Sequence, residues 1–154
     1  FSADLKMWVD VAAQYEQGNF KYHTTLPTDA LVEVHRSALE TKALGWDNAK
    51  RAQWELGNKV RDVLTSRGLT SVAAPGFEAP GVVVVHTPLP DMVKRFMDEG
   101  LQVAAGVPFK CDEPEATQTF RVGLFGLDKL THVDETVEVF SSALSKVLAS
   151  KGSL

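Results

Sequence analysis

Residues 119–126 alternate between apolar side chains and other residues, and this pattern constrains the fold more than any other stretch of the sequence. The apolar positions are Phe120, Val122 and Leu124. A period of two is typical of a β-strand with one buried face. Arg121 and Gly123 share the opposite face. Because glycine has no side chain, a small molecule could lie against the backbone beside the arginine.

Helical periodicity recurs on both sides of this strand. The helices that we expect cover residues 4–17, 28–43, about 47–67, 89–99 and about 134–148. Asp47 is a candidate N-cap and Gly68 a candidate C-cap of the third helix, while residues 131–134 resemble a capping box before the last. Three further extended segments are expected at residues 69–73, 81–86 and 102–105. The sequence therefore predicts an α/β fold, a two-layer sandwich of strands and helices.

Composition narrows the possible functions. The 154 residues are 44% hydrophobic and 23% charged, which suits one ordinary core. A net charge of -4 argues against a nucleic-acid partner. The longest aliphatic run, residues 82–85, is too short to cross a bilayer. Cys111 is the only cysteine, so no internal disulfide can form and we expect a reducing, cytoplasmic location.

Candidate metal ligands are few. Four scattered histidines and one cysteine have no zinc-site spacing, so no metal site is expected. Cys111 has no neighbouring base that would activate it, and we interpret it as an incidental loop thiol.

A second segment, read together with the strand at residues 119–126, points to a protein family. Residues 22–27 read Tyr-His-Thr-Thr-Leu-Pro, and the strand reads Arg-Val-Gly-Leu-Phe-Gly from Arg121. In this order and at a similar separation, the two segments resemble the class V aminotransferases. These are pyridoxal-phosphate enzymes that include alanine:glyoxylate and serine:pyruvate aminotransferases. The resemblance runs through nearly the whole chain but covers only the C-terminal part of such an enzyme. Since the chain starts at Phe1, we expect a processed product or an excised fragment.

The resemblance implies an architecture and a set of site residues. It implies the small domain of a fold type I enzyme over residues 46–154, an α/β two-layer sandwich with a small, mainly antiparallel sheet covered by helices. A helical entry segment over residues 1–45 precedes this domain. Arg121 matches the arginine that binds the substrate carboxylate. Tyr22 and Thr25 match residues that reach the cofactor phosphate of the other subunit in a homodimer, with His23 as a further candidate.

Other interpretations of these residues stay open. Arg121 could be a solvated surface arginine or could pair with a local carboxylate such as Asp128. Tyr22 could be a packing residue with a hydrated hydroxyl. His23 could be an ordinary polar loop residue.

The resemblance also implies what this chain lacks. Neither the Schiff-base lysine motif nor the aspartate that pairs with the pyridine nitrogen is found here. No catalytic residue is therefore expected, and the isolated chain should neither hold pyridoxal 5'-phosphate tightly nor catalyse transamination.

Three functional hypotheses follow. The first is an aminotransferase fragment whose parent moves an amino group between a small amino acid and a 2-oxo acid such as glyoxylate or pyruvate. The alternative is a stand-alone, non-enzymatic α/β module that binds a small ligand or a protein, and the third is an accidental resemblance. Because the first long helix carries an apolar stripe, we also expect either an oligomer or a rearranged N-terminal segment.

Overall fold

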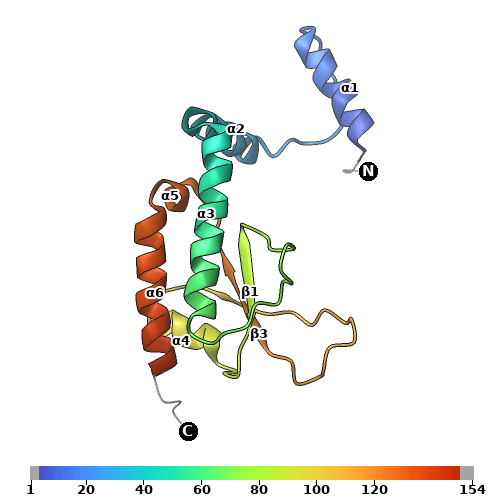
Figure 1. Cartoon of the computed structure of the whole chain (residues 1–154). Helices are drawn as coiled ribbons and strands as arrows, with labels where there is room; N and C mark the ends of the chain where they lie inside the picture. Colours follow the sequence, from blue (N-terminus) through green and yellow to red (C-terminus); the bar gives the residue numbers. More distant parts are fainter. Residues whose placement is uncertain (1–3, 150–154) are drawn as a thin grey trace. The chain divides into compact units, whose positions relative to one another are not determined.

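The computed structural model describes residues 4–149, which form two compact units divided after Glu40 (Figure 1). Helix α1 spans Leu5–Glu16, and helix α2 spans Thr28–Leu44, so α2 begins in the first unit and ends in the second. The predicted domains, residues 1–45 and 46–154, stay a prediction.

The N-terminal unit has little buried surface of its own. Asp4 caps α1, because its carboxylate accepts a hydrogen bond of 3.1 Å from the amide of Met7. Among the described residues of α1 only Val11 is buried, whereas Leu5 and Val9 are exposed. The helix expected over residues 4–17 is confirmed, although most of its apolar face is not covered within the unit. Helix α2 has no buried residue.

Helix α3 spans Trp46–Thr65 and is the long helix of the C-terminal unit. Its N-cap is Gly45, with φ of 92°, so Asp47 lies in the first turn and the predicted cap is wrong. The C-terminal prediction is confirmed. Gly68 has φ of 83°, and the amides of Gly68 and Leu69 bond carbonyls of the last turn at 3.0 and 3.2 Å. A left-handed glycine with these two hydrogen bonds is a Schellman motif.

Three strands form one antiparallel sheet in the order β1-β3-β2. They are β1 (Val82–His86), β2 (Ala104–Ala105) and β3 (Thr119–Gly123). The predicted strand at residues 69–73 is wrong, since only an isolated bridge joins Ser71 to Val85. The remaining strands lie where the sequence predicts them, although β2 is only two residues long.

Three helices complete the C-terminal unit: α4 (Met92–Asp98), α5 (Leu127–Thr131) and α6 (Val133–Ala149). The sequence did not predict α5. The carbonyl of His132 accepts the first bond of α6, from Thr136 at 3.0 Å. The hydroxyl of Thr131 instead donates to the Leu127 carbonyl at 2.9 Å. The predicted capping box is therefore wrong, because its threonine closes the helix before it.

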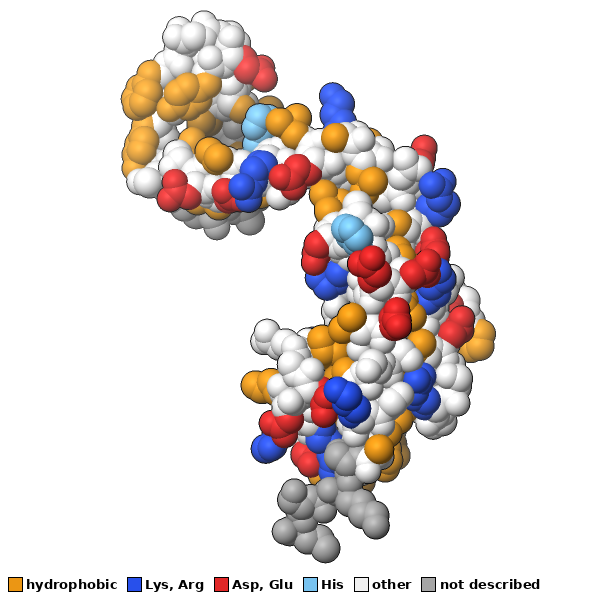
Figure 2. Space-filling view, turned by 90° about the vertical axis from the view of Figure 1, so that its left-hand side faces the viewer, with side chains coloured by type: hydrophobic (Ala, Val, Ile, Leu, Met, Phe, Trp, Pro, Cys, Tyr) orange, Lys and Arg blue, Asp and Glu red, His pale blue; other side chains and the backbone are white. Residues whose placement is uncertain are grey.

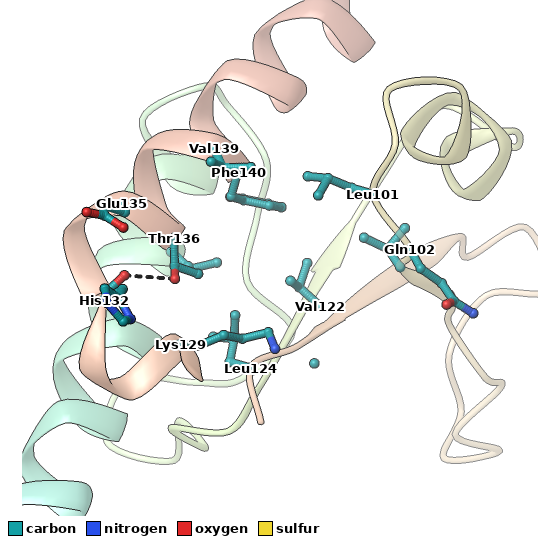
Figure 3. A pocket seen from close by; sticks show the side chains of 13 residues that line it. Leu101, Gln102, Val122, Leu124, Lys129, His132, Glu135, Thr136, Val139 and Phe140 are labelled. Carbon is teal, nitrogen blue, oxygen red and sulfur yellow. Dashed lines mark hydrogen bonds between the residues drawn. The ribbon is translucent and has the colours of Figure 1, made fainter. Parts of the chain in front are cut away.

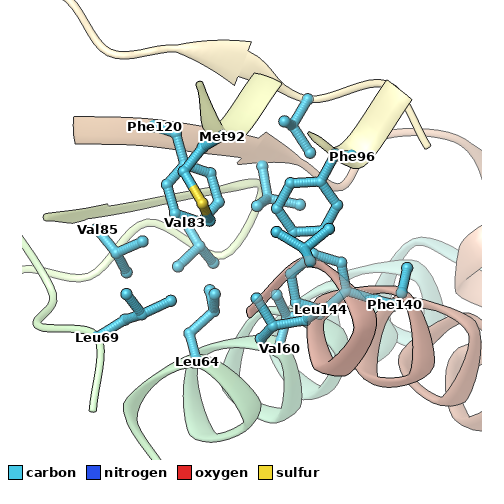
Figure 4. Close-up of a cluster of buried hydrophobic side chains, with 14 of the residues drawn as sticks. Val60, Leu64, Leu69, Val83, Val85, Met92, Phe96, Phe120, Phe140 and Leu144 are labelled. Atoms are coloured by element: carbon cyan, nitrogen blue, oxygen red, sulfur yellow. The ribbon is translucent and has the colours of Figure 1, made fainter. Parts of the chain in front are cut away.

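The core lies between one face of the sheet and helices α3, α4 and α6 (Figures 1 and 4). Phe96 of α4 stacks on Phe140 of α6 with ring centroids 5.7 Å apart, and its other aromatic neighbour is Phe120 of β3, also at 5.7 Å. The fully buried aliphatic residues include Leu56, Val60, Leu64, Val83, Val85 and Leu144. This arrangement confirms the predicted α/β class, with a small sheet covered by helices.

Two surface findings accompany this fold. Acidic and basic side chains are interspersed over the C-terminal unit on the face seen in Figure 2. No helix within residues 4–149 is both long and apolar enough to span a membrane.

Candidate functional site

Arg121 lies in the middle of the central strand, on the sheet face that the helices leave open. Its neighbours in sequence, Phe120 and Val122, point into the core, so its own side chain points the other way and is exposed. Across the sheet it is paired with Val84 of β1 and Ala104 of β2. Both of these residues are half-buried, so the side chains on either side of the arginine on this sheet face are small and apolar.

The Arg121 guanidinium has no hydrogen bond or ion pair to any residue within the described range 4–149. The local carboxylate considered as its partner, Asp128, instead lies 3.2 Å from the ammonium of Lys129. The hydrogen bond from Lys129 lowers the pKa of Asp128. The fork of donors on Arg121 is therefore available to a ligand.

Gly123 leaves space on the same face. A Cβ added at Gly123 would come no closer than 3.8 Å to other atoms, and the nearest belong to the ring of Phe125. That ring is exposed. A small planar anion therefore has room beside Arg121, over Gly123, with the aromatic ring of Phe125 next to it.

The hydroxyls of Tyr22 and Thr25 lie together in the N-terminal unit. Their oxygens are 3.5 Å apart, on the irregular segment between α1 and α2. Both residues are exposed. Because each hydroxyl can donate one hydrogen bond, this pair could bind two oxygens of one anion.

His23 is turned toward α1. Its ring packs edge-on against Trp8, with centroids 5.2 Å apart and an interplanar angle of 78°. The histidine is half-buried, while its neighbour Tyr22 is exposed. The resemblance assigned all three residues to the cofactor, and this role stays a prediction. The structure shows the hydroxyls of Tyr22 and Thr25 together and the His23 ring against Trp8.

Cys111 lies in a loop that a carboxylate organises. Glu113 accepts hydrogen bonds from the amides of Lys110 and Cys111, both at 2.8 Å. These two amides, Cys111 first, lower the pKa of Glu113 to about 2. Lys110 and Asp112 both have positive φ, at 56° and 65°. The sequence analysis missed this role of Glu113, because its carboxylate accepts from amides that precede it, whereas the familiar Asp or Asn turn bonds the backbone that follows.

A cavity of about 370 Å³ lies on the helix side of the sheet (Figure 3). Leu101 and Gln102 precede β2, Val122 and Leu124 come from the β3 region, and Phe140 comes from α6. Sequence reasoning missed it. No local pattern could have found it, because its walls come together only in the folded unit.

The comparisons with known proteins give matches among solved structures alone. No family model matches this sequence, and neither does any curated protein. A solved structure of aspartate aminotransferase of subgroup IV from Thermus thermophilus matches with a TM-score of 0.48 and 19% sequence identity. The match covers 62% of this chain and 26% of that chain, so this chain spans about a quarter of that protein's length.

Proposed function

We propose that this chain is part of a class V aminotransferase, in which Arg121 binds the carboxylate of the substrate. The observation that carries the proposal is the guanidinium of Arg121, exposed at the centre of the open sheet face and paired with none of the described residues. The two sequence segments at residues 22–27 and 119–126 support it through their resemblance to that family.

Arginine suits both halves of a transamination. The amino acid and the 2-oxo acid, such as glyoxylate or pyruvate, differ at the α-carbon but share one carboxylate. A guanidinium can bond both oxygens of that group, which fixes the orientation of the α-carbon as well as its position. The single residue Arg121 can therefore hold donor and acceptor in the same pose.

The residues of the N-terminal unit fit one end of pyridoxal phosphate. The adjacent hydroxyls of Tyr22 and Thr25 are exposed, and both can donate to phosphate oxygens. By the resemblance, this phosphate belongs to the cofactor of the second subunit in a homodimer. When bound, pyridoxal phosphate withdraws electrons from the α-carbon of the substrate. Nothing in this chain resembles the cofactor-binding lysine motif, so the isolated chain should not transaminate.

A second candidate is a non-enzymatic module that binds a small ligand. The favouring observation is that the C-terminal unit has a continuous core of its own, formed by residues from Leu56 to Val147. Such a unit needs no catalytic residue for Arg121 to capture a carboxylate.

The test uses the native protein that contains this chain, purified from its source and assayed with alanine, serine, glyoxylate and pyruvate. We expect the visible absorption of bound pyridoxal phosphate and transfer of the amino group. Arg121→Lys should lower kcat/KM by about 10- to 100-fold for both the amino acid and the oxo acid, since one of two charge-assisted bonds is lost.

Lys146→Met is the matched control, because it also removes an exposed cation from the C-terminal unit. An equal loss of kcat/KM in both variants would refute the role of Arg121. A native protein without bound cofactor or amino transfer, but with pyruvate binding that depends on Arg121, would favour the module.

A further inference from the structure

The cavity on the helix side of the sheet has mainly apolar walls. They are Leu101, Val122, Leu124, Val139 and Phe140. Figure 3 shows these side chains around a space between α6 and the sheet. Its volume of about 370 Å³ lies in the range typical of small-molecule sites. The cavity is therefore suited to the hydrocarbon part of a small ligand.

The backbone of Gly123 adds polar groups to this cavity. In β3 the amides that face β1 alternate with those that face β2, and Leu124 bonds the Gly81 carbonyl on the β1 side at 2.9 Å. Gly123 therefore directs its N–H and C=O toward the β2 side. Strand β2 begins at Ala104, opposite Arg121. Within the described residues, no hydrogen bond joins Gly123 to this side.

Lys129 supplies a positive charge to the cavity that Gly123 also lines. Figure 3 shows its side chain extending from α5 toward Leu124, while the carboxylate of Glu135 points away from the cavity. The partner of Lys129 is Asp128, whose side chain is 75% exposed, so water weakens this ion pair. The Nδ1 atom of His132 lies 3.0 Å from the Asp128 carbonyl and is engaged within α5.

We propose that this cavity binds a small apolar monocarboxylate. The carboxylate accepts hydrogen bonds from the Lys129 ammonium and the Gly123 amide, and the hydrocarbon body lies against Val122, Leu124 and Phe140. An anionic group suits these two donors, because the Lys129 ammonium carries a full positive charge and the Gly123 N–H a partial positive charge. A pairing peptide strand suits it less well, because the β3 edge is open only beyond Arg121.

This site is independent of the proposed aminotransferase function. Arg121 projects from the open face of the sheet, whereas the side chains of Val122 and Leu124 that line the cavity are buried on the helix side. Two carboxylate sites would then use the same strand, β3. One site uses the Arg121 side chain on the open face, and the other uses the Gly123 amide on the strand edge that borders the cavity.

The experiment is a methyl-detected NMR titration of the 154-residue chain with 3-phenylpropanoate, compared with the neutral 3-phenylpropanamide. We expect saturable shifts of the Leu101, Val122 and Val139 methyl signals, with a Kd of about 1 mM for a ligand of this size. The amide should bind about tenfold more weakly, because it lacks the charge that Lys129 recognises.

Lys129→Met should reduce affinity for the acid about tenfold and leave affinity for the amide unchanged. Lys146→Met is the matched control, since Lys146 is also an exposed, ion-paired lysine but does not line this cavity. Val139→Trp should abolish binding of both compounds by filling the cavity. The residue tolerates this change because it is 57% exposed.

Three results would overturn the proposal: no saturable shift, equal affinity for the acid in Lys129→Met and the unmodified chain, or loss of the cavity shifts in Arg121→Met. Shifts of the same methyl signals with protein concentration alone would also overturn it, because a second copy of the chain would then occupy the cavity. Methyl spectra of the variants without ligand establish that each is folded.

Discussion

Gly57 lies within α3, where alanine would ordinarily stabilise a helix by about 1 kcal/mol. The fold reverses this expectation. A Cβ at residue 57 would lie 2.5 Å from the carbonyl oxygen of Pro80 and 3.0 Å from its Cα. Both atoms belong to the backbone just before β1. Relief would therefore require α3 to move away from the segment that leads into the sheet.

The size of the effect follows from what else holds Pro80 in place. The side-chain amide of Gln53 donates to the Pro80 carbonyl at 3.0 Å and to the Leu124 carbonyl at 3.2 Å. Overpacking costs about 1–3 kcal/mol, and a weakened hydrogen bond about 1 kcal/mol more. After the gain of about 1 kcal/mol in helix propensity, Gly57→Ala should lower the free energy of unfolding by about 2 kcal/mol.

Urea denaturation, followed by circular dichroism, measures this difference. The midpoint for Gly57→Ala should fall by about 1 M. Asn58→Ala is the matched control, because the next residue of the same helix is exposed, and it should raise the free energy of unfolding by about 0.5 kcal/mol. If Gly57→Ala is as stable as the unmodified chain while Asn58→Ala behaves as expected, the close approach of α3 and Pro80 is refuted.

Arg67, which follows the C-cap of α3, donates a hydrogen bond to the Ser141 hydroxyl of α6 at 2.7 Å. Arg67→Met should lower the free energy of unfolding by about 1–2 kcal/mol, and an unchanged urea midpoint would contradict this. Glu113 has its pKa lowered from 4.5 to about 2 by the amides of Cys111 and Lys110. Its charged form therefore stabilises the loop above pH 4.5, and this contribution is lost as the pH falls through about 2. The two amide NMR signals should titrate near 2, and a midpoint near 4.5 would count against the contact.

The sequence predicted the C-terminal unit better than the N-terminal one, for a physical reason. In α6, Phe140 and Leu144 recur at helical spacing and are buried, because α3 and the sheet cover that face. In α1, Leu5 and Val9 show a similar spacing but are exposed. Periodicity identifies which face of a helix is apolar, whereas burial depends on the rest of the fold.

Strand boundaries show the same distinction. The segment at residues 69–73 has suitable side chains, yet it makes only the bridge from Ser71 to Val85. The turn after α3 brings the chain close to β1, and the loop beyond it leaves before a ladder forms. Propensity alone could not reveal this, because strand formation requires a partner over several residues.

For the candidate site too, the sequence predicted one feature of Arg121 and not another. The period of two predicted that Arg121 lies opposite the buried Phe120 and Val122, and the structure places it there. The absence of a partner among the described residues was not predictable, because Asp128 is close in sequence and stayed open as an alternative partner. In the structure Asp128 lies in α5, a helix with no clear sequence signal, and its carboxylate contacts the ammonium of the adjacent Lys129 instead.

The short length of β2 has the widest consequence for function. Had β2 extended by two residues, Gln102 would pair with Gly123 and close the edge of β3. The cavity would then lose its backbone donor, while Arg121 on the open face would keep its surroundings. The two carboxylate sites proposed here therefore differ in origin, since one depends on a side chain and the other on where a strand ends. Arg121→Met and Lys129→Met should accordingly impair separate binding events in the same chain.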